Sequence, residues 1–481
     1  MTSSAKADAL LAINRFGMGP RPGSIEQIAA DPRGALLADL DRPIADPSAG
    51  AVLPTSAMAF RTVVDANAKR QAKAIMATRA EAEAKRQQMA AAPTMAEGTS
   101  PAISETATRM AAEAVPDPRQ SIYLEEVKRR IETALGAGIG FAERLVWFWS
   151  NHFCISADKI QSMSGGYERE AIRPHVLAPF VDLLLAAEGH PAMLFYLDNG
   201  ASMGANSIAG INRSRGLNEN LAREILELHT LGVRGGYTQD DVIGFANVLT
   251  GWTWLPPADN PDHGGEFSFN PRLHEPGAQK VLGKLYEQDG VEQGRAVLRD
   301  LACHPATATH VAAKLARAFV ADEPSPALIE KMAKVFRDSS GDLREVARAM
   351  VTSDEAWAEP QTKLKRPTEW VVSMVRACGI TQVDAKRFTA GQALLGEPMW
   401  RPPSPKGFAD DEASWVDGIG RRLDIANNFA ERIAGRTDPQ DIIENVLGSC
   451  VSSDVKETVA RAESRQQALA LLFMSREFLR R

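Results

Sequence analysis

Cysteine is scarce in this 481-residue sequence, and its four cysteines form no recognisable motif. Cys154, Cys303, Cys378 and Cys450 lie far apart, so the chain has no CxxC pair. Zinc ribbons and thiol redox proteins need such pairs, and both classes are therefore disfavoured. Nothing in the spacing supports a structural disulfide.

The signatures of several large enzyme classes are missing as well. The sequence has no GxSxG nucleophile elbow, no HExxH zinc motif and no GKS or GKT phosphate loop. The glycine-rich stretch GAGIGFAE at 136–143 follows a predicted helix, whereas a phosphate loop follows a strand. We therefore expect neither a nucleophile-elbow hydrolase, nor a zincin, nor a nucleotide-binding fold.

Long apolar runs and a basic net charge are also absent. No segment approaches the roughly 20 apolar residues that span a bilayer, and the N-terminal stretch has no apolar core of signal-peptide length. The net charge is −6 and the pI about 5.9, so no global positive field attracts nucleic acid or anionic lipid. The sequence predicts a soluble, cytoplasmic protein with no membrane span and no nucleic-acid partner.

Helical patterns dominate what is present. Apolar residues recur at helical spacing in segments such as SIYLEEVKRRIETALG and GFAERLVWFWSNHF, which Gly and Pro separate. Only GEFSFN and QKVLGK look like strands, and strands do not alternate with helices as a doubly wound sheet requires. We expect an all-α, irregular multi-helix protein with one small β-hairpin near residues 265–284.

Polar residues mark the starts of several expected helices. The patterns are a capping box at Ser24 and Gln27, a second at Thr238 and Asp241, and Asp31 before Pro32.

Composition divides the chain into four parts. Residues 1–60 predict short helices that pack on the main body, and 61–120 combine a long Ala-rich helix with a Pro, Ser and Thr-rich linker. Residues 121–287 predict a central helical domain with the hairpin and a candidate polar site, and 288–481 a C-terminal helical domain. The 61–120 segment is either a docking element or a disordered insertion.

The segment GLNENLAREILELHTLGV at 216–233 concentrates polar groups in one predicted helix. On a helical wheel, Glu224 falls inside the apolar arc, with Asn220 and Glu227 at its edge and His229 about 140° from Glu224. Glu224 and His229 therefore cannot bind one ion from this helix. A carboxylate that faces a core must be paired, metal-bound or protonated. Two interpretations of Glu224 stay open: an ion pair with Arg173 or Arg144, or a site carboxylate with a raised pKa or a metal.

Two histidines are further candidates. His152 shares a helix face with Leu145, Phe148 and Trp149, so it is either a hydrogen-bonded core residue or a ligand. His274 lies in a loop after a short strand, where functional groups concentrate, and its alternative role is to stabilise the hairpin.

Three more positions carry polar groups where a predicted helix breaks or ends. Arg173 precedes a proline, which suits a fixed guanidinium that pairs with a carboxylate or an anion, and pairing within the protein is the favoured use. Asp198 and Asn199 follow a short helix and either cap the next element or line a polar pocket.

The chain resembles the bacterial family catalogued as domain of unknown function 1800. The resemblance covers nearly the whole chain outside 60–120. Its motifs are LLAINRFGMGPRPG, ERLVWFWSNHF, REAIRPHVLAPFVDLLLAAEGHPAMLFYLDN, NENLAREILELHTLGVRGGYTQDDV, LTGWT, FNPRLHEPGAQKVLGK, HPATATHVAAKLARAFV, WRPPSPKGF and LLFMSREFLRR.

What the resemblance implies about function is limited. Members of the family have no settled activity, look mainly helical and often bear an export signal. They are often encoded beside a second family that resembles sulfatases and alkaline phosphatases. The resemblance therefore implies a sulfatase-like partner and the periplasm as an alternative location.

The resemblance also ranks the candidate residues. The family tolerates an aromatic at the position of His229, so His229 is a poor candidate. In this chain HEPG stands where the family more often has His-Asp and Gly, so Glu275 keeps the acid but extends its reach. The stronger candidates are Asn218, Glu219, Asn220, Arg223 and Glu224, with His152 and His274.

Two hypotheses for function follow. The first is a metal-assisted hydrolase or transferase whose pocket forms where the 141–153 helix, the 216–233 helix and the His274 loop converge. In it, Glu224, His152 and His274 bind a divalent metal or act as acid and base, and Arg173 or Arg223 holds an anionic substrate. The groups assigned to ligand binding are Asn218, Glu219, Asn220, Arg223, Asp198 and Asn199. The second hypothesis is a non-catalytic partner or scaffold protein that acts with a sulfatase-like enzyme and docks through the 62–92 helix.

Overall fold

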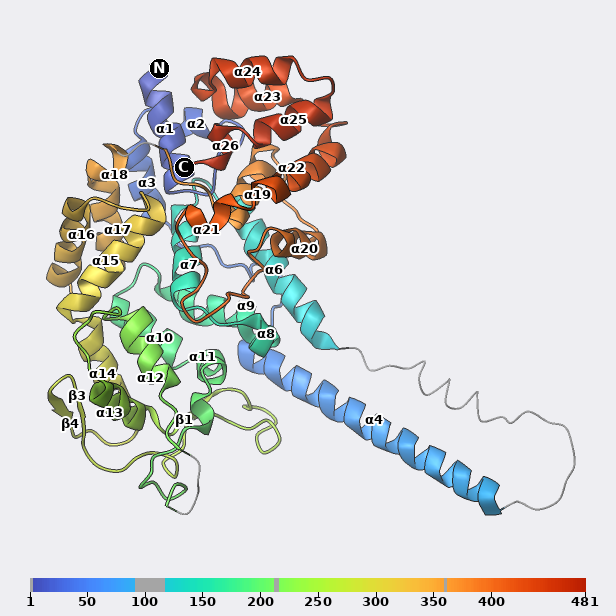
Figure 1. The fold of residues 1–481 in the computed structure, drawn as a ribbon, viewed down its shortest axis with the longest axis vertical. Coiled ribbons are helices and arrows are strands. Elements are labelled where there is room, and N and C mark those ends of the chain that lie inside the picture. Colours follow the sequence, from blue (N-terminus) through green and yellow to red (C-terminus); the bar gives the residue numbers. More distant parts are fainter. Residues whose placement is uncertain (1–2, 91–116, 212–215, 359–360) are drawn as a thin grey trace, which may run out of the picture.

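The computed structural model describes residues 3–90, 117–211, 216–358 and 361–481, and this part of the chain is mostly helical (Figure 1). The expected all-α class is therefore confirmed. The helices of the first half are α1 (Ser3–Arg15), α2 (Ser24–Ile28), α3 (Pro32–Leu40), α4 (Ser56–Ala90), α6 (Pro118–Gly136), α7 (Phe141–His152), α8 (Ala157–Ile160), η1 (Gln161–Met163), α9 (Ser164–Tyr167), η2 (Glu168–Ile172), η3 (Arg173–His175), α10 (Phe180–Glu188), α11 (Pro191–Tyr196), η4 (Asn199–Ala201), α12 (Asn220–Glu224), η5 (Ile225–His229) and α13 (Gln239–Leu249).

The second half of the chain continues as helices. They are α14 (Val291–Ala302), α15 (Pro305–Phe319), α16 (Pro326–Asp338), α17 (Leu343–Thr352), α18 (Glu355–Ala358), α19 (Pro367–Ala377), α20 (Ala385–Leu394), α21 (Ala413–Val416), α22 (Ile419–Ile433), α23 (Pro439–Ile442), η6 (Ile443–Leu447), η7 (Gly448–Cys450), α24 (Ser453–Ala460), α25 (Arg465–Phe473) and α26 (Arg476–Leu479).

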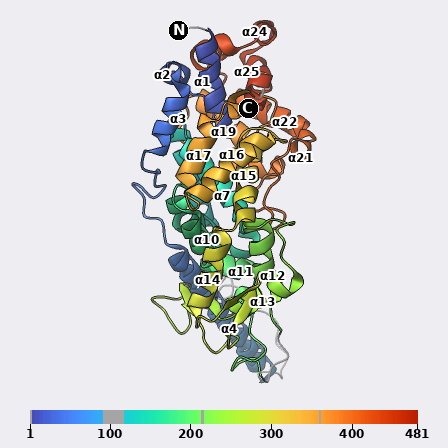
Figure 2. The ribbon, with the colours of Figure 1, turned by 90° about the vertical axis from the view of Figure 1, so that its left-hand side faces the viewer.

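The aromatic helix α7 lies at the centre of the body (Figures 1 and 2). Phe141 packs against Phe16 of α1 at a ring distance of 5.6 Å and against Phe319 of α15 at 5.7 Å. Trp149 packs against Phe180 of α10 at 5.7 Å. Segments that are far apart in the sequence therefore meet on α7 and form one core.

The N-terminal helices lie against the C-terminal ones. Figure 1 shows α1 and α2 next to α24 and α26, and the Gly23 amide before α2 donates to the Asn445 carbonyl in η6. Residue Leu364 also forms a β-bridge with Arg480, next to the C-terminus. The first and last segments thus build one end of the body together.

Helix α4 leaves this body (Figure 1). Its first turns contact η1, α6 and α9, and Ala57, Ala59, Val63 and Ala66 are buried there. No side chain described in residues 67–87 is buried. The long Ala-rich helix expected over 62–92 is therefore present and largely exposed beyond Asn67, while the expected linker at 91–116 falls outside the described residues.

The expected strands form two small antiparallel sheets instead of pairing with each other. β1 (Trp252–Trp254) pairs with β2 (Phe267–Phe269), and β3 (Gln279–Val281) pairs with β4 (Lys284–Tyr286). The tight turn between β3 and β4 contains Gly283 at a φ of 77°, which glycine adopts without steric cost. The expected strand GEFSFN takes WTW as its partner because both present aromatic side chains to the same core.

Two of the three expected helix starts are present. Thr238 and Asp241 form a reciprocal capping box, and Asp31 accepts the Gly34 amide with Pro32 at the first helical position. The capping box at Ser24 is wrong: Gly23 is the N-cap, and the Ser24 hydroxyl accepts the Arg21 amide instead.

Within the described residues, no helix combines the length and the apolar character needed to cross a bilayer.

One buried arginine connects α19 with the end of α6 and with the segment after α1. The Arg376 guanidinium in α19 donates to five carbonyls, those of Gly19, Ala134, Leu135, Ala137 and Gly138. Arg376 therefore caps the end of α6 and fixes it to both α19 and the segment after α1.

We predict that Arg376→Met lowers the free energy of unfolding by about 3–5 kcal/mol, because it leaves these buried carbonyls without donors. Urea denaturation followed by circular dichroism measures the change. Arg461→Met, at a side chain that is 80% exposed, is the matched control and is expected to have almost no effect. A loss below about 1 kcal/mol for Arg376→Met would contradict the assigned role.

Candidate functional site

The loop that follows α20, residues 399–410, is fixed against α7. The Asn151 side chain donates to the Phe408 carbonyl at 2.9 Å and accepts the Phe408 amide at 2.8 Å. The Ala157 amide donates to the Trp400 carbonyl at 2.7 Å. Gly407 has a φ of 84° and lies so close that a Cβ atom would come within 2.5 Å of the Asn151 carbonyl oxygen. The loop therefore forms a rigid wall beside α7.

A cavity of about 70 Å³ lies between this wall, α7 and the start of α19. A single water needs roughly 10–15 Å³ of cavity volume, so the cavity has room for several waters or for a small ionic group. Its charged lining residues come from both halves of the sequence: Arg130, Arg144, Arg366, Glu369, Glu397 and Asp410. We call it the α7 cavity.

Arg130 enters the α7 cavity between two indoles. Its guanidinium lies 4.5 Å from the Trp147 ring centroid and 5.5 Å from that of Trp400. Its Nε atom lies 2.8 Å from both carboxylate oxygens of Glu168. The Trp400 indole donates to the same carboxylate at 3.0 Å, so Glu168 orients the Trp400 ring and the guanidinium, while the Trp147 indole donates to Glu143 at 3.2 Å.

Glu168 belongs to the π-turn η2, which places a second arginine nearby. Arg173 lies 3.8 Å from Glu168 and binds Glu143 through two hydrogen bonds of 2.6 and 2.8 Å. Arg173 is therefore committed to an ion pair within the protein, the use that the sequence favours. In the structure it does not line the α7 cavity.

Arg144 shares one carboxylate with the C-terminal residue. Arg144 and Arg481 each bind Glu369 at 2.9 Å, and all three side chains are at most 9% exposed. Burial would raise the pKa of Glu369, but Arg144, Arg481 and Arg366 outweigh it and lower that pKa to about 2. Burial lowers the pKa of Arg144 to about 10, so both groups are charged at neutral pH.

Arg366 is the third guanidinium of the α7 cavity. It forms an ion pair with Glu397 and lies 3.6 Å from Asp410. Its Nε atom is buried and has no hydrogen-bond partner among the described residues. A buried donor without a partner indicates that something else accepts its hydrogen bond in solution.

Two more buried basic side chains lie against α19 and bind neutral acceptors. Lys365 donates to Asn14 and Ser373, and Arg422 donates to the Lys365 carbonyl. Burial lowers the pKa of Lys365 to about 7 and that of Arg422 to about 10. The formal charges of the six charged lining residues sum to 3 − 3 = 0, and Glu369 is shared between Arg144 and Arg481.

A histidine cluster occupies the other side of α7. His152 lies with its Nε2 atom 3.1 Å from the His229 carbonyl oxygen, and its ring centroid is 6.2 Å from that of His310. His229 Nδ1 lies 2.7 Å from a carboxylate oxygen of Glu188, although their alignment is not that of a hydrogen bond. His152, His229 and Glu188 are at most 1% exposed.

The burial of His229 corrects the helical wheel. The segment is α-helical only to Glu224, and residues 225–229 form the π-turn η5, which is closed by Thr230 bonding to the Ile225 carbonyl. A π-turn takes more residues per turn, so a wheel at a constant 100° misplaces every side chain after it begins. Asn220 precedes the π-turn, at the first position of α12, and its side chain is exposed.

Glu224 is partly buried at the edge of the histidine cluster. Burial raises its pKa, His229 and Arg223 lower it, and Glu227 and Glu188 raise it further. The expected ion pair with Arg144 or Arg173 is wrong, because these arginines bind Glu369 and Glu143. Within the described residues, no ion pair or side-chain hydrogen bond holds Glu224.

The remaining polar residues of the 216–233 segment stabilise the start of α12. Asn218 donates to the carbonyls of Leu197 and Asp198 and accepts the Asn220 amide. Glu219 and Arg223 form an ion pair of 2.6 Å on the surface. None of these groups lines the α7 cavity.

Asp198 and Asn199 have separate structural roles. Asp198 has a left-handed φ of 58° and binds Lys159 at 2.6 Å. Asn199 is buried and donates to the carbonyls of Leu249 and Trp252. The capping expected of these two side chains is not observed, since η4 begins without a side-chain cap.

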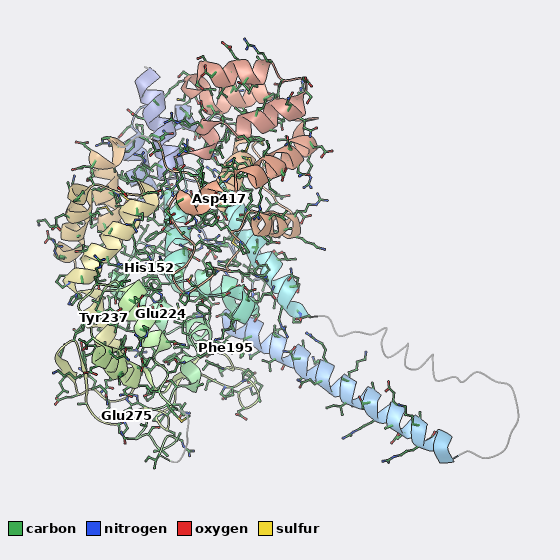
Figure 3. All side chains as sticks on the ribbon, in the orientation of Figure 1. His152, Phe195, Glu224, Tyr237, Glu275 and Asp417 are labelled. Carbon is green, nitrogen blue, oxygen red and sulfur yellow. The ribbon has the colours of Figure 1, made fainter. Side chains whose placement is uncertain are left out.

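His274 lies apart from the helices that it was expected to join. Its Nδ1 atom is 2.9 Å from the Thr250 carbonyl oxygen, and its ring packs on Phe269. The neighbouring Glu275 accepts two hydrogen bonds from Asn206 and is far from His152 in Figure 3, near the strands. These contacts stabilise the loop around the small sheets, as the alternative role proposed.

No group of three or more His, Cys, Asp or Glu residues that could hold a metal ion exists in the described ranges. Glu224, His152 and His274 therefore do not form the expected three-ligand set in this structure.

The residues of the α7 cavity could have been found only in part. Arg366 precedes Pro367 as Arg173 precedes Pro174, and WRPPSPKGF already stands out as a family motif. For the histidine cluster, the local signal is the Glu188 carboxylate, which ends a strongly apolar helix. Nothing in the sequence indicates that Arg130, Arg144 and Arg366 converge, because they come from separate helices.

The burial of two histidines predicts a pH-dependent stability. Burial, with Lys314 and the neighbouring histidines, lowers the pKa of His152 well below 6.5 and that of His310 to about 4. The folded state therefore binds fewer protons than the unfolded state between pH 6.5 and 4, and stability falls as the pH drops through this window.

Between pH 7.5 and 5, the free energy of unfolding of His310→Gln is expected to fall by about 2 kcal/mol less than that of wild type. Urea denaturation at each pH measures the difference. Glutamine keeps a donor for the Leu228 carbonyl that His310 contacts at 3.0 Å. His263→Gln, at an exposed histidine, controls for the loss of an imidazole. Parallel pH profiles for wild type and His310→Gln would contradict a neutral, partly buried His310.

Comparisons with known proteins give one match. The family model described as "Protein of unknown function (DUF1800)" matches residues 11–480. Neither the search of curated proteins nor the search of solved structures found a match to the chain. Since the family model covers nearly the whole sequence, the chain belongs to the DUF1800 family.

Proposed function

We propose that the protein binds a small anion, or the anionic group of a larger substrate, in the α7 cavity. The convergence of three guanidinium groups from α6, α7 and the start of α19 in one cavity supports this proposal. Arginine binds carboxylates and phosphates through paired, directional hydrogen bonds, and burial strengthens them. The Nε atom of Arg366, which is buried without a partner among the described residues, is the donor available to the anion.

The shared carboxylate of Glu369 supports the same ligand. Glu369 binds both Arg144 and Arg481 at 2.9 Å, so neither guanidinium has a carboxylate of its own. An anion in the α7 cavity would give Arg144 a further acceptor. The rings of Trp147 and Trp400 hold Arg130 in place and exclude water from one side of the cavity.

For the reaction, we propose the hydrolase or transferase class. Glu397 and Asp410 line the α7 cavity beside the proposed anion and supply carboxyl groups that can exchange protons with a bound substrate. Substrate binding by arginine next to a carboxylate is the arrangement that acyl and phosphoryl transfer use.

A non-catalytic partner protein remains the second candidate, because α4 offers an exposed surface. Beyond Asn67 this helix projects from the body, and Ile75 and Met76 are 55% and 63% exposed on it. A sulfatase-like protein is the partner that we propose for this case. The anion experiment below separates the two candidates, because a scaffold protein has no need of an anion in the α7 cavity.

We predict that inorganic phosphate, sulfate or acetate binds the purified protein, as measured by calorimetric titration at constant ionic strength with chloride as the reference salt. Arg366→Lys keeps the charge but loses the Nε donor, and it is expected to weaken binding by about 10-fold or more. Arg401→Lys is the control, because Arg401 belongs to the same loop but binds Asp158 outside the cavity. Arg130→Lys provides a second cavity variant if Arg366→Lys is unstable.

The proposal would be contradicted if none of the three anions binds at about 10 mM. A Kd above this concentration corresponds to a binding free energy of less than about 3 kcal/mol. Equal binding by wild type and both cavity variants would also contradict it, and would favour the partner protein.

A further inference from the structure

A second cavity lies between α19, α20 and α22, beyond the start of α19 that lines the α7 cavity. Its volume is about 490 Å³, which is within the roughly 300–1,000 Å³ of small-molecule sites. We call it the α20 pocket. Figure 1 shows these three helices beside one another, away from the histidine cluster around His152 in Figure 3.

The floor of the α20 pocket is apolar. Met374, Phe388 and Ile433 are at most 9% exposed, and Phe429 packs against the buried Phe473 at a ring distance of 5.7 Å. The other apolar lining residues are Val371, Val375, Ile380, Val383, Leu394 and Ile425. A floor of this kind gains free energy from each methylene that it removes from water, about 0.8 kcal/mol per CH₂.

The rim of the α20 pocket is basic. Arg387, Arg432 and Arg436 line it together with one carboxylate, Asp384, so the formal charge of these four groups is 3 − 1 = +2. Asp384 lies 3.4 Å from Arg387 and is its partner. In the described ranges, Arg432 and Arg436 have no ion pair and no side-chain hydrogen bond, and both are exposed.

From these features we infer that the α20 pocket binds a single-chain amphiphile with an anionic head, such as a fatty acid. The alkyl chain occupies the apolar floor, and the carboxylate or phosphate head pairs with Arg432 and Arg436 at the rim. A purely apolar ligand would leave both guanidinium groups without a partner, and a cationic amphiphile would meet like charge. Leu394 is 62% exposed and extends the apolar surface from the floor to the mouth.

The pocket also offers a substitution that tests the occupant without removing a packed side chain. Gly391 lines it within α20, and a Cβ atom there would meet only Ile425 Cδ1, at 3.7 Å, which is an ordinary contact. Gly391→Leu therefore fills the pocket while replacing a helix-interior glycine with a better helix former. The variant is expected to fold at least as well as wild type.

The experiment is a calorimetric titration of the full chain with dodecanoate and with dodecyl phosphate below their micellar concentrations, and with dodecyltrimethylammonium as the cationic comparison. We expect at least one anionic amphiphile to bind at micromolar concentration, and its affinity to fall about 10-fold in Arg432→Gln/Arg436→Gln. Gly391→Leu is expected to abolish the binding. Arg461→Gln, at the exposed arginine that follows α24, is the matched control for the loss of surface charge.

Equal affinity for the cationic and anionic amphiphiles would overturn the inference, as would unchanged binding in Gly391→Leu. Absence of binding by both anionic probes would overturn it as well. These results are independent of the α7 cavity, because the amphiphile variants lie outside its lining and the short anions used to test that cavity have no alkyl chain.

Discussion

The carboxylate of Glu369 is the interaction on which much of this structure depends. It lies between Arg144 of α7 and the C-terminal Arg481, each at 2.9 Å, and so joins the central helix to α19 and to the end of the chain. A pKa lowered from 4.5 to about 2 corresponds to about 3 kcal/mol of stability, which is present above pH 4.5 and is lost as the pH falls towards 2. Removal of the Glu369 carboxylate, or of the guanidinium groups that bind it, would lower stability by more, because the remaining charge would stay buried without a partner.

The ion pairs of Glu369 hold α7 in place, and the two sides of this helix carry different groups. On one side, the loop at 399–410 encloses a small cavity with guanidinium groups and indoles. On the other side, His152, His229 and Glu188 form a fully buried group that no solute reaches without movement of the fold. The anion proposal therefore concerns the first side, and the histidine cluster acts on stability and its pH dependence.

How much the sequence could predict depended on the range of the interactions involved. The helical class, the long helix α4 and the capping box at Thr238 and Asp241 were predictable, because periodicity and capping are local. The π-turn η5 was not predictable, and His229, which the wheel placed about 140° from Glu224, is fully buried beside Glu188. A single inserted turn of this kind shifts every later side chain, and no propensity marks it.

The candidate site shows the same limit at longer range. The sequence correctly identified Glu224 as a carboxylate near an apolar face, but its expected arginine partners were taken by Glu143 and Glu369. The polar residues Asn218, Glu219 and Arg223 attracted attention by their density, yet they stabilise a helix start. The three cavity arginines are separated by more of the chain than any local pattern spans, so only the tertiary structure brings them together.

The most direct test of the anion site is a crystal structure determined with selenate or bromide in the crystallisation solution, with anomalous scattering used to locate the ions. We expect an anomalous peak in the α7 cavity within roughly 3.5 Å of Arg366 Nε and close to Arg130 and Arg144. Anomalous peaks confined to the protein surface, with water alone in the α7 cavity, would contradict the account.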